Sequence, residues 1–157
     1  MEQLYYSSKR LIERMVGLVV LSVFAGTRTG SRLSFNIGIC DALDKEEAAG
    51  IENEALGVFI SNASWRFLRN DKLLACSDDI LDCESTALKN IQSTKNAVIT
   101  QVSINEVTLD LVMQFSSEIL LQVFCSNSDC VSYSLLDIDK AFVVQTLHGK
   151  ATIVLEM

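Results

Sequence analysis

Four carboxylates lie close together in the middle of the chain, at Asp78, Asp79, Asp82 and Glu84. Paired carboxylates can carry out acid–base catalysis or bind a divalent cation. The spacing does not match a calcium-binding loop, because the sequence lacks an Asp-x-Asp-x-Asp-Gly run. The alternative is that the cluster caps the helix expected after it, since negative charge is favourable at a helix N-terminus. We expect the capping role.

Other catalytic patterns are missing from the sequence. The single histidine, His148, has no locatable carboxylate or nucleophile partner, so we expect it to be a surface or capping residue. There is no Gly-x-Ser-x-Gly turn, no phosphate-binding glycine loop and no His-Glu-x-x-His pair. The sequence therefore predicts a protein that is not an enzyme and that needs no metal or cofactor.

The only tryptophan, Trp65, stands next to Arg66. Tryptophan and arginine dominate the energetics of protein interfaces, so the pair could anchor a partner. The alternative is that Trp65 packs in the core, since an aromatic residue, Tyr133, takes a similar place later in the chain. We expect the core position.

The cysteines are odd in number and no two form a Cys-x-x-Cys pair. This pattern predicts neither a disulfide framework nor a zinc site, and it is typical of free thiols in a reducing cytoplasm. They stand at Cys40, Cys76, Cys83, Cys125 and Cys130.

The composition is that of a globular protein, with 49% hydrophobic and 21% charged residues in 157. A net charge of −7 argues against nucleic acid as a partner, because phosphate backbones require clustered Lys and Arg. The charge either favours a basic protein partner or only keeps the chain soluble. Proline is absent, which fits a sheet-rich chain because proline is excluded from central strands.

The first part of the chain predicts a helix followed by a β-hairpin. Apolar residues at helical spacing predict a helix over about 5–16, with Ser7 or Ser8 as its N-cap. The apolar run over 18–25 predicts a well-buried strand, and the alternation over 33–37 predicts a strand with one buried face. The alternative is a secretory signal over the apolar run from Met15 to Ala25, which fits less well because Glu13 and Arg14 stand just before the run.

The second part repeats this order. Asp82 is expected to cap a helix over about 83–92, followed by strands near 98–104, 109–113 and 119–125. The breaks between these strands are too short for crossover helices, so the sequence predicts an antiparallel meander.

The chain also repeats a motif. Residues 54–64 are echoed by 118–128, and Trp65 is matched by Tyr133. We therefore predict an α+β fold, in which internally duplicated units of a helix and an antiparallel meander form one sheet-rich domain. The domain spans 1–157, with halves at about 1–79 and 80–157.

The halves differ by an acidic insertion between 39 and 57, which contains one lysine, Lys45. Its secondary structure is expected to be a short helix or a loop. Its carboxylates are Asp41, Asp44, Glu46, Glu47, Glu52 and Glu54.

The run Ser64-Trp65-Arg66-Phe67, followed by a polar turn and by residues 72–79, resembles small bacterial immunity proteins of polymorphic toxin systems, including contact-dependent growth inhibition. The resemblance covers about 54–136. It implies a cytoplasmic protein that binds and neutralises a cognate toxin domain. Many toxin domains are basic, so we expect an acidic partner-binding surface made by Asp41, Asp44, Glu46, Glu47, Glu52 and Glu54, together with Asp78, Asp79 and Asp82.

Two alternatives remain. The chain could be a structural or regulatory module that self-associates through a sheet edge, with 151–155 as the candidate strand. It could also be an enzyme that uses the carboxylates at 78–84 with a metal ion. No membrane partner is expected, because the longest apolar run is too short to span a bilayer.

Overall fold

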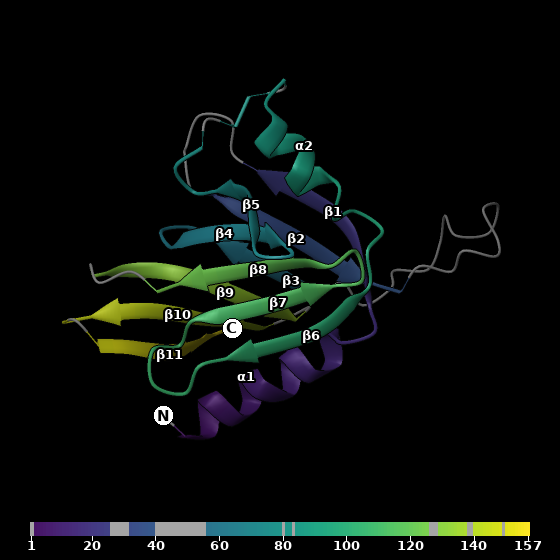
Figure 1. The fold of residues 1–157 in the computed structure, drawn as a ribbon. Helices are drawn as coiled ribbons and strands as arrows, with labels where there is room; N and C mark the ends of the chain where they lie inside the picture. The colour runs from purple at the N-terminus through teal and green to yellow at the C-terminus, as the bar shows by residue number, and fades with distance from the viewer. Residues whose placement is uncertain are drawn as a thin grey trace.

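The computed structural model describes residues 2–25, 32–39, 56–79, 81–82, 84–125, 129–137, 140–148 and 150–157. Strands predominate, and two helices accompany them (Figure 1). The elements are α1 (Glu2–Met15), β1 (Val19–Ala25), β2 (Leu33–Gly38), β3 (Leu56–Ile60), β4 (Ser64–Arg69), β5 (Lys72–Cys76), α2 (Thr86–Gln92), β6 (Ile99–Ile104), β7 (Leu111–Phe115), β8 (Ile119–Phe124), β9 (Cys130–Asp137), β10 (Lys140–Leu147) and β11 (Lys150–Glu156).

The strands form two antiparallel sheets, and each sheet contains strands from both parts of the chain. The six-stranded sheet has the order β1-β2-β3-β9-β10-β11, and the five-stranded sheet has the order β5-β4-β8-β7-β6. The predicted hairpin (β1–β2) and meander (β6–β7–β8) are both present. Strands from the other half extend each of these units. The β1–β2–β3 meander is extended by β9, which pairs with β3, and the β6–β7–β8 meander is extended by β4, which pairs with β8.

The helices lie at opposite ends of the layered sheets (Figure 1). The first helix, α1, contacts β6, β9 and β11, whereas α2 contacts β5 and β1. Each helix therefore packs against the first strand that follows the other helix. Among the described residues, no helix is long and apolar enough to cross a membrane.

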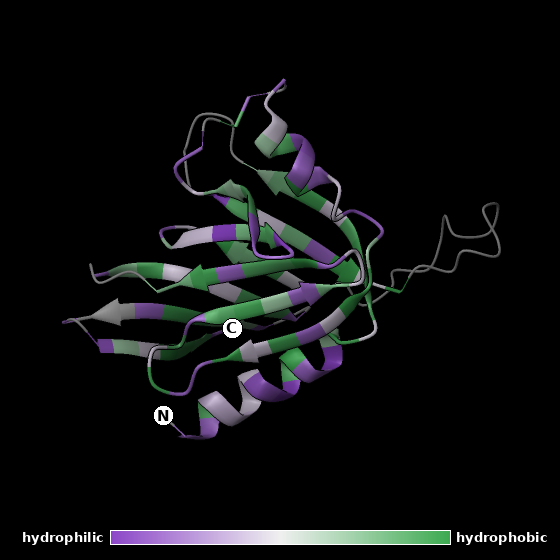
Figure 2. Cartoon of the chain, in the orientation of Figure 1, coloured by the Kyte–Doolittle hydropathy of each residue, from purple (hydrophilic) through white to green (hydrophobic). Residues whose placement is uncertain are grey.

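The core lies between the inner faces of the two sheets, and the hydrophobic residues gather on the strands (Figure 2). The Phe35 ring on β2 lies 6.3 Å from that of Phe67 on β4 and 6.0 Å from that of Phe115 on β7. Trp65 meets Phe67 edge-on at 5.7 Å. Both Trp65 and Tyr133 are buried, so the expected core position of Trp65 is confirmed.

The starts of β1 and β6 meet at one corner of the two sheets. Val19 and Val98 form an isolated antiparallel bridge there. The backbone hydrogen bonds around this bridge form two matched pairs. In the first pair, the Gly17 N–H donates to the Ile99 carbonyl and the Asn96 N–H donates to the Val20 carbonyl, both at 2.8 Å. In the second pair, the Val20 N–H donates to the Ala97 carbonyl at 3.0 Å and the Ile99 N–H donates to the Leu18 carbonyl at 2.8 Å. If the segments around β1 and β6 are exchanged, each hydrogen bond takes the place of the other bond in its pair.

The match extends into the strands. The pairing of β1 with β2 shifts register between Val20 and Ser22, and the pairing of β6 with β7 shifts between Ile99 and Gln101. A β-bulge of this kind adds one residue to one strand and increases its twist. Both sheets therefore begin with the same irregularity at the same distance from the corner.

The prediction for the first helix is wrong at its start. α1 begins at Glu2, and both Ser7 and Ser8 lie inside it. Their hydroxyls donate to backbone carbonyls within the helix, that of Ser7 to Gln3 and that of Ser8 to Tyr5. A serine can make this bond in place of a cap, and the sequence does not distinguish the two arrangements.

The second helix is shorter than predicted and has a different cap. α2 starts at Thr86, and the Ser85 hydroxyl accepts a hydrogen bond from the Leu88 N–H. Asp82 instead accepts from the Glu84 N–H, at 3.1 Å, within the preceding turn. The predicted cap at Asp82 is therefore wrong, because a serine closer to the helix occupies the cap position.

Two strand predictions also need correction. β1 is only partly buried, with Val20 as its fully enclosed side chain, because it is the outermost strand of the six-stranded sheet. Leu109 was expected in a strand but precedes β7, with a φ of 58°. The predicted edge strand at 151–155 is present as β11, at the other side of the same sheet.

Candidate functional site

The predicted acidic surface lies only partly among the described residues. Asp41, Asp44, Glu46, Glu47, Glu52 and Glu54 lie outside them. Asp78, Asp79 and Asp82 lie between β5 and α2. The Asp79 carboxylate accepts the Cys76 N–H at 2.7 Å and so closes the turn after β5. Asp78 is exposed and remains the carboxylate of this connection best placed to meet a partner.

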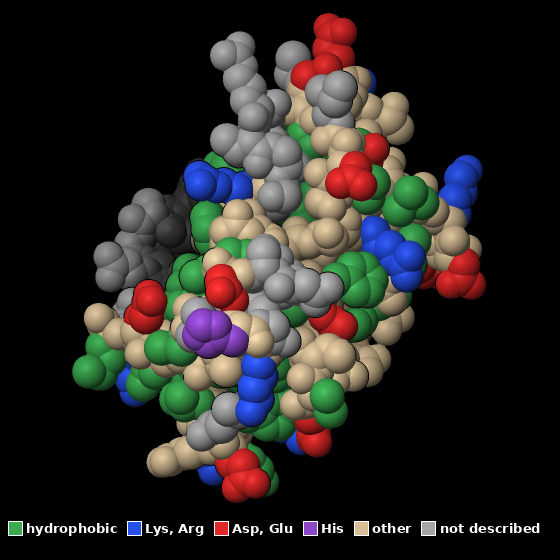
Figure 3. All heavy atoms as spheres, turned by 90° about the vertical axis from the view of Figure 1, so that its left-hand side faces the viewer, with side chains coloured by type: hydrophobic (Ala, Val, Ile, Leu, Met, Phe, Trp, Pro, Cys, Tyr) green, Lys and Arg blue, Asp and Glu red, His purple; other side chains and the backbone are tan. Residues whose placement is uncertain are grey.

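The described carboxylates do not gather into a metal site. Among the described residues, no three His, Cys, Asp or Glu side chains come together as metal ligands. On the side of the molecule shown in Figure 3, the coloured acidic and basic side chains are interspersed. His148 is exposed, and its backbone N–H donates to Asp129 at 2.6 Å.

Trp65 and Arg66 do not act as one anchor, because neighbouring residues of a strand point to opposite faces. Trp65 points into the core. Arg66 lies on the outer face of the five-stranded sheet, where its Nε donates to the Gln122 amide oxygen at 2.6 Å. Its guanidinium also lies 5.3 Å from the centre of the Phe124 ring, within cation–π range.

A groove with a volume of about 740 Å³ lies at the N-terminal half of α1. This volume is in the range of ligand-binding clefts. Its walls come from α1, from the connection between β6 and β7, and from β11. The lining residues are Glu2, Tyr5, Tyr6, Lys9, Glu106, Val107, Leu109, Lys150, Ala151 and Ile153.

A tightly bonded loop forms one wall of this groove. The Asn105 side-chain oxygen accepts the N–H groups of Val107 and Thr108, at 2.8 and 2.9 Å. The Asn105 N–H donates to the Asp110 carbonyl at 2.9 Å, which closes the loop at its base. The loop therefore holds Val107 in a fixed position, although that side chain is 85% exposed.

Three hydrogen bonds, from Tyr133 and Cys125, attach the end of this loop to the molecule. The Leu109 carbonyl accepts a hydrogen bond from the Tyr133 hydroxyl at 2.7 Å and a longer one from the Cys125 thiol at 3.3 Å. The Asp110 carboxylate accepts the Cys125 N–H at 2.8 Å. The positive φ of Leu109, which is unfavourable for a leucine, is maintained by these bonds.

Burial affects the acidity of the groups behind the groove. It raises the pKa of the Cys125 thiol to about 11, with a further contribution from the Asp110 charge. It also raises the pKa of Tyr133 well above its ordinary range. Both groups stay protonated at neutral pH, so Cys125 is a poor nucleophile there and serves as a hydrogen-bond donor.

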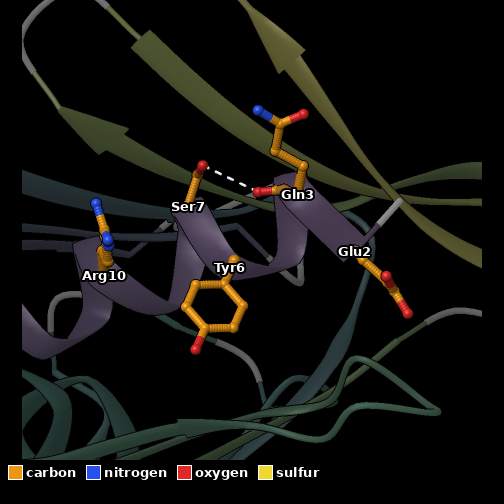
Figure 4. A pocket seen from close by; sticks show the side chains of 5 residues that line it. All are labelled: Glu2, Gln3, Tyr6, Ser7 and Arg10. Atoms are coloured by element: carbon orange, nitrogen blue, oxygen red, sulfur yellow. Dashed lines mark hydrogen bonds between the residues drawn. The ribbon is translucent and has the colours of Figure 1, made fainter.

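Two tyrosines of α1 take different positions at the groove. The Tyr5 hydroxyl donates to the Ile104 carbonyl at 3.3 Å, and burial together with the Glu106 charge raises the pKa of Tyr5. Tyr6 is 65% exposed. It also lines a second hollow of about 400 Å³ with Glu2, Gln3, Ser7 and Arg10, where its ring points away from the Gln3 and Ser7 side chains (Figure 4).

Tyr6 and Val107 were not predicted as site residues. The sequence indicated only a break at Asn105-Glu106, and an asparagine is typical of a turn. Nothing local showed that this turn faces α1 and β11, because those elements are remote in sequence.

Comparison with protein-family models, with curated proteins and with solved structures gives no match to this chain.

Proposed function

We propose that this chain is a binding protein that neutralises a cognate toxin domain in the cytoplasm, as an immunity protein does. An acidic surface directs the encounter, and the groove beside α1 supplies the contact. The observation that carries the proposal is Val107, an apolar side chain held almost fully exposed at the groove by a hydrogen-bonded loop.

The rigidity of the loop is what favours a binding role. Ordering a flexible side chain or loop at an interface costs free energy, and a group already held in place avoids that cost. Val107 is fixed by the Asn105 turn, and Tyr6 lines the same groove as an exposed aromatic residue. Aromatic residues are over-represented among the side chains that dominate interfaces. A partner that fills the groove with apolar side chains would bury both Tyr6 and Val107.

The acidic surface has a different role in this proposal. A chain with a net charge of −7 attracts a basic domain over distances set by the salt concentration. Charge reversal at Glu46 and Glu47, or at the exposed Asp78, should slow association most at low salt. Asp79 and Asp82 are unsuitable for this test, because their carboxylates hold the local turn.

The experiment measures association and dissociation rates separately, with the captured toxin domain immobilised. Val107→Asp and Tyr6→Ala should raise the dissociation rate, whereas Glu46→Lys/Glu47→Lys should lower the association rate. A matched control is Leu73→Asp, which changes an exposed apolar residue on β5, away from the groove. Unchanged rates in every groove variant would exclude the groove as the contact.

We also infer that the two halves, 1–79 and 80–157, arose by duplication of one unit. The support is the pair of additional hydrogen bonds from Gly17 and Asn96, which an antiparallel bridge does not itself impose, and the bulges at the same place in β1 and β6. Trp65 and Tyr133 also take corresponding positions, since β4 follows one meander and β9 follows the other. Substitutions at paired positions should therefore have similar effects.

A second candidate function, self-association through a sheet edge, is favoured by one observation. β11 is the outermost strand of its sheet, and such a strand has backbone groups that can pair with another chain. Sedimentation of the purified protein tests this second function, which requires that the protein form a homodimer without a ligand. A proline substitution at a β11 position whose N–H points outward should abolish an edge dimer.

A further inference from the structure

The outer face of the six-stranded sheet has an unusual composition. Residues directly opposite one another in paired strands share a face, so the register defines rows that cross the whole sheet. The first row consists of Phe24, Ser34, Phe59, Ser134, Val143 and Val154, of which Val143 is buried beneath its neighbours at 4% exposure. The second row consists of Ser22, Asn36, Gly57, Leu136, Ala141 and Glu156.

Only the last of these residues, Glu156 at the sheet edge, carries a charge. Phe24 is 63% exposed, and Phe59, Leu136 and Val154 are each exposed by between 37% and 39%. Small residues separate them. At Gly57 an added Cβ would lie 3.3 Å from the Leu136 side chain, so Leu136 leans across the glycine. Across the described residues of these two rows, the face is therefore low in relief, partly apolar and, apart from Glu156, uncharged.

Neither helix covers this face. The α1 residues Leu11, Ile12 and Met15 belong to the buried core between the sheets, and α2 contacts β5 and β1. The outer face of the five-stranded sheet differs at its centre, where Arg66 bonds to Gln122. A charged residue at that place disfavours burial against an apolar surface.

We propose that the outer face of the six-stranded sheet binds the same face of a second copy of this chain. Two copies with a net charge of −7 each repel one another, so they can approach closely only where charge is absent from both. Homodimer interfaces are depleted of charge and richer in apolar area than other surfaces. The two rows have this composition, with serines able to bond across a two-fold axis.

The size of the face suits a weak dimer. Six strands spaced about 4.8 Å apart and a few rows along each strand give on the order of 500 Å² of flat area. Specific interfaces bury about 600 Å² or more on each partner. The face is slightly smaller than that, so the dimer should be weak and transient and should form only at high protein concentration.

Sedimentation velocity over a concentration series tests this proposal with the whole chain. The wild type should shift from monomer to dimer as its concentration rises, and Phe59→Asp should remain a monomer. Phe24→Asp, on the more exposed edge strand, is a second variant that disturbs folding less. Leu73→Asp is the matched control on the other sheet, and it should dimerise like the wild type.

Salt separates this proposal from the proposed function. Dimerisation of two like-charged copies through an uncharged face should strengthen as salt screens their repulsion. Binding of a basic toxin domain should weaken over the same range. A wild type that stays monomeric at all concentrations, or a dimer that persists unchanged in both Phe24→Asp and Phe59→Asp, would overturn the face-to-face dimer. Neither result would affect the groove.

Discussion

Gly17 and Asn96 occupy corresponding positions at the corner where the two sheets meet. Both have left-handed backbone conformations, with φ of 88° and 70°. Each donates its N–H, at 2.8 Å, to a carbonyl in the strand that follows the other. Glycine and asparagine are the residues that adopt this conformation most easily, so two different residues satisfy one structural requirement.

The first prediction concerns this corner. Gly17→Ala should reduce the free energy of unfolding by about 1 kcal/mol, although there is open space around the glycine, because alanine disfavours a positive φ. Asn96→Ala should cost a similar amount, and Asn96→Gly should be neutral or slightly stabilising. Urea unfolding of the three variants measures the effect. A stable Gly17→Ala together with a destabilised Asn96→Ala would contradict the equivalence of the two positions.

The second prediction concerns the bond that fixes the groove loop to the core. Tyr133→Phe removes the hydroxyl that donates to the Leu109 carbonyl at 2.7 Å. The loss should lower the free energy of unfolding by about 1–2 kcal/mol, because that carbonyl is left with the weaker thiol donor. Tyr6→Phe is the matched control on an exposed ring, and it should change stability by less than about 0.5 kcal/mol. Equal effects of the two variants would show that the bond contributes nothing.

The third prediction distinguishes the two candidate caps of α2. Ser85→Ala should destabilise the protein by about 1 kcal/mol, because the Ser85 hydroxyl accepts the Leu88 N–H. Asp82→Ala should cost less, since its carboxylate serves only the preceding turn. Thermal unfolding of both variants provides the comparison. A larger loss at Asp82 would restore the cap that the sequence predicted.

The sequence predicted the local elements well where its apolar pattern was regular. Alternation over 33–37 and over 98–104 identified β2 and β6, since a strand with one buried face repeats every second residue. The hairpin and the meander followed from the short breaks between strands. The helix starts were wrong because several serines and aspartates near each start could serve as a cap, and only packing selects among them.

The exchange of strands between the two sheets could not be predicted. The pairing of β3 with β9 joins residues far apart in the chain, and nothing in either strand specifies the other. The groove was missed for the same reason, because Tyr6, Val107 and Ile153 come from three remote segments. The predicted carboxylates at 41–54 lie outside the described residues, so their role stays a prediction.

The fourth prediction concerns stability at alkaline pH. In the folded protein the pKa of Cys125 is raised from 9.0 to about 11, so the unfolded chain loses this proton first. The folded state binds more protons between these values, and the free energy of unfolding should fall as the pH rises from 9 to 11. Below pH 9 the contribution is fully present.

Urea unfolding at pH 8 and at pH 10.5 measures this change in the wild type and in Cys125→Ala. The variant should show a smaller loss between the two conditions, because its side chain cannot ionise. The remaining loss reports other groups, including Tyr133, whose pKa is also raised by burial. An identical loss in both proteins would mean that Cys125 is not responsible.

Capture of the partner from the native host with the tagged chain, at low and at moderate salt, tests the proposed function. Wild type and Leu73→Asp should retain one basic protein, less of it as salt rises, and Val107→Asp should lose it. Expression of the captured domain alone should stop growth, and co-expression of this chain should restore it. Capture of nothing but the chain itself, or of a protein whose expression is harmless, would contradict the account.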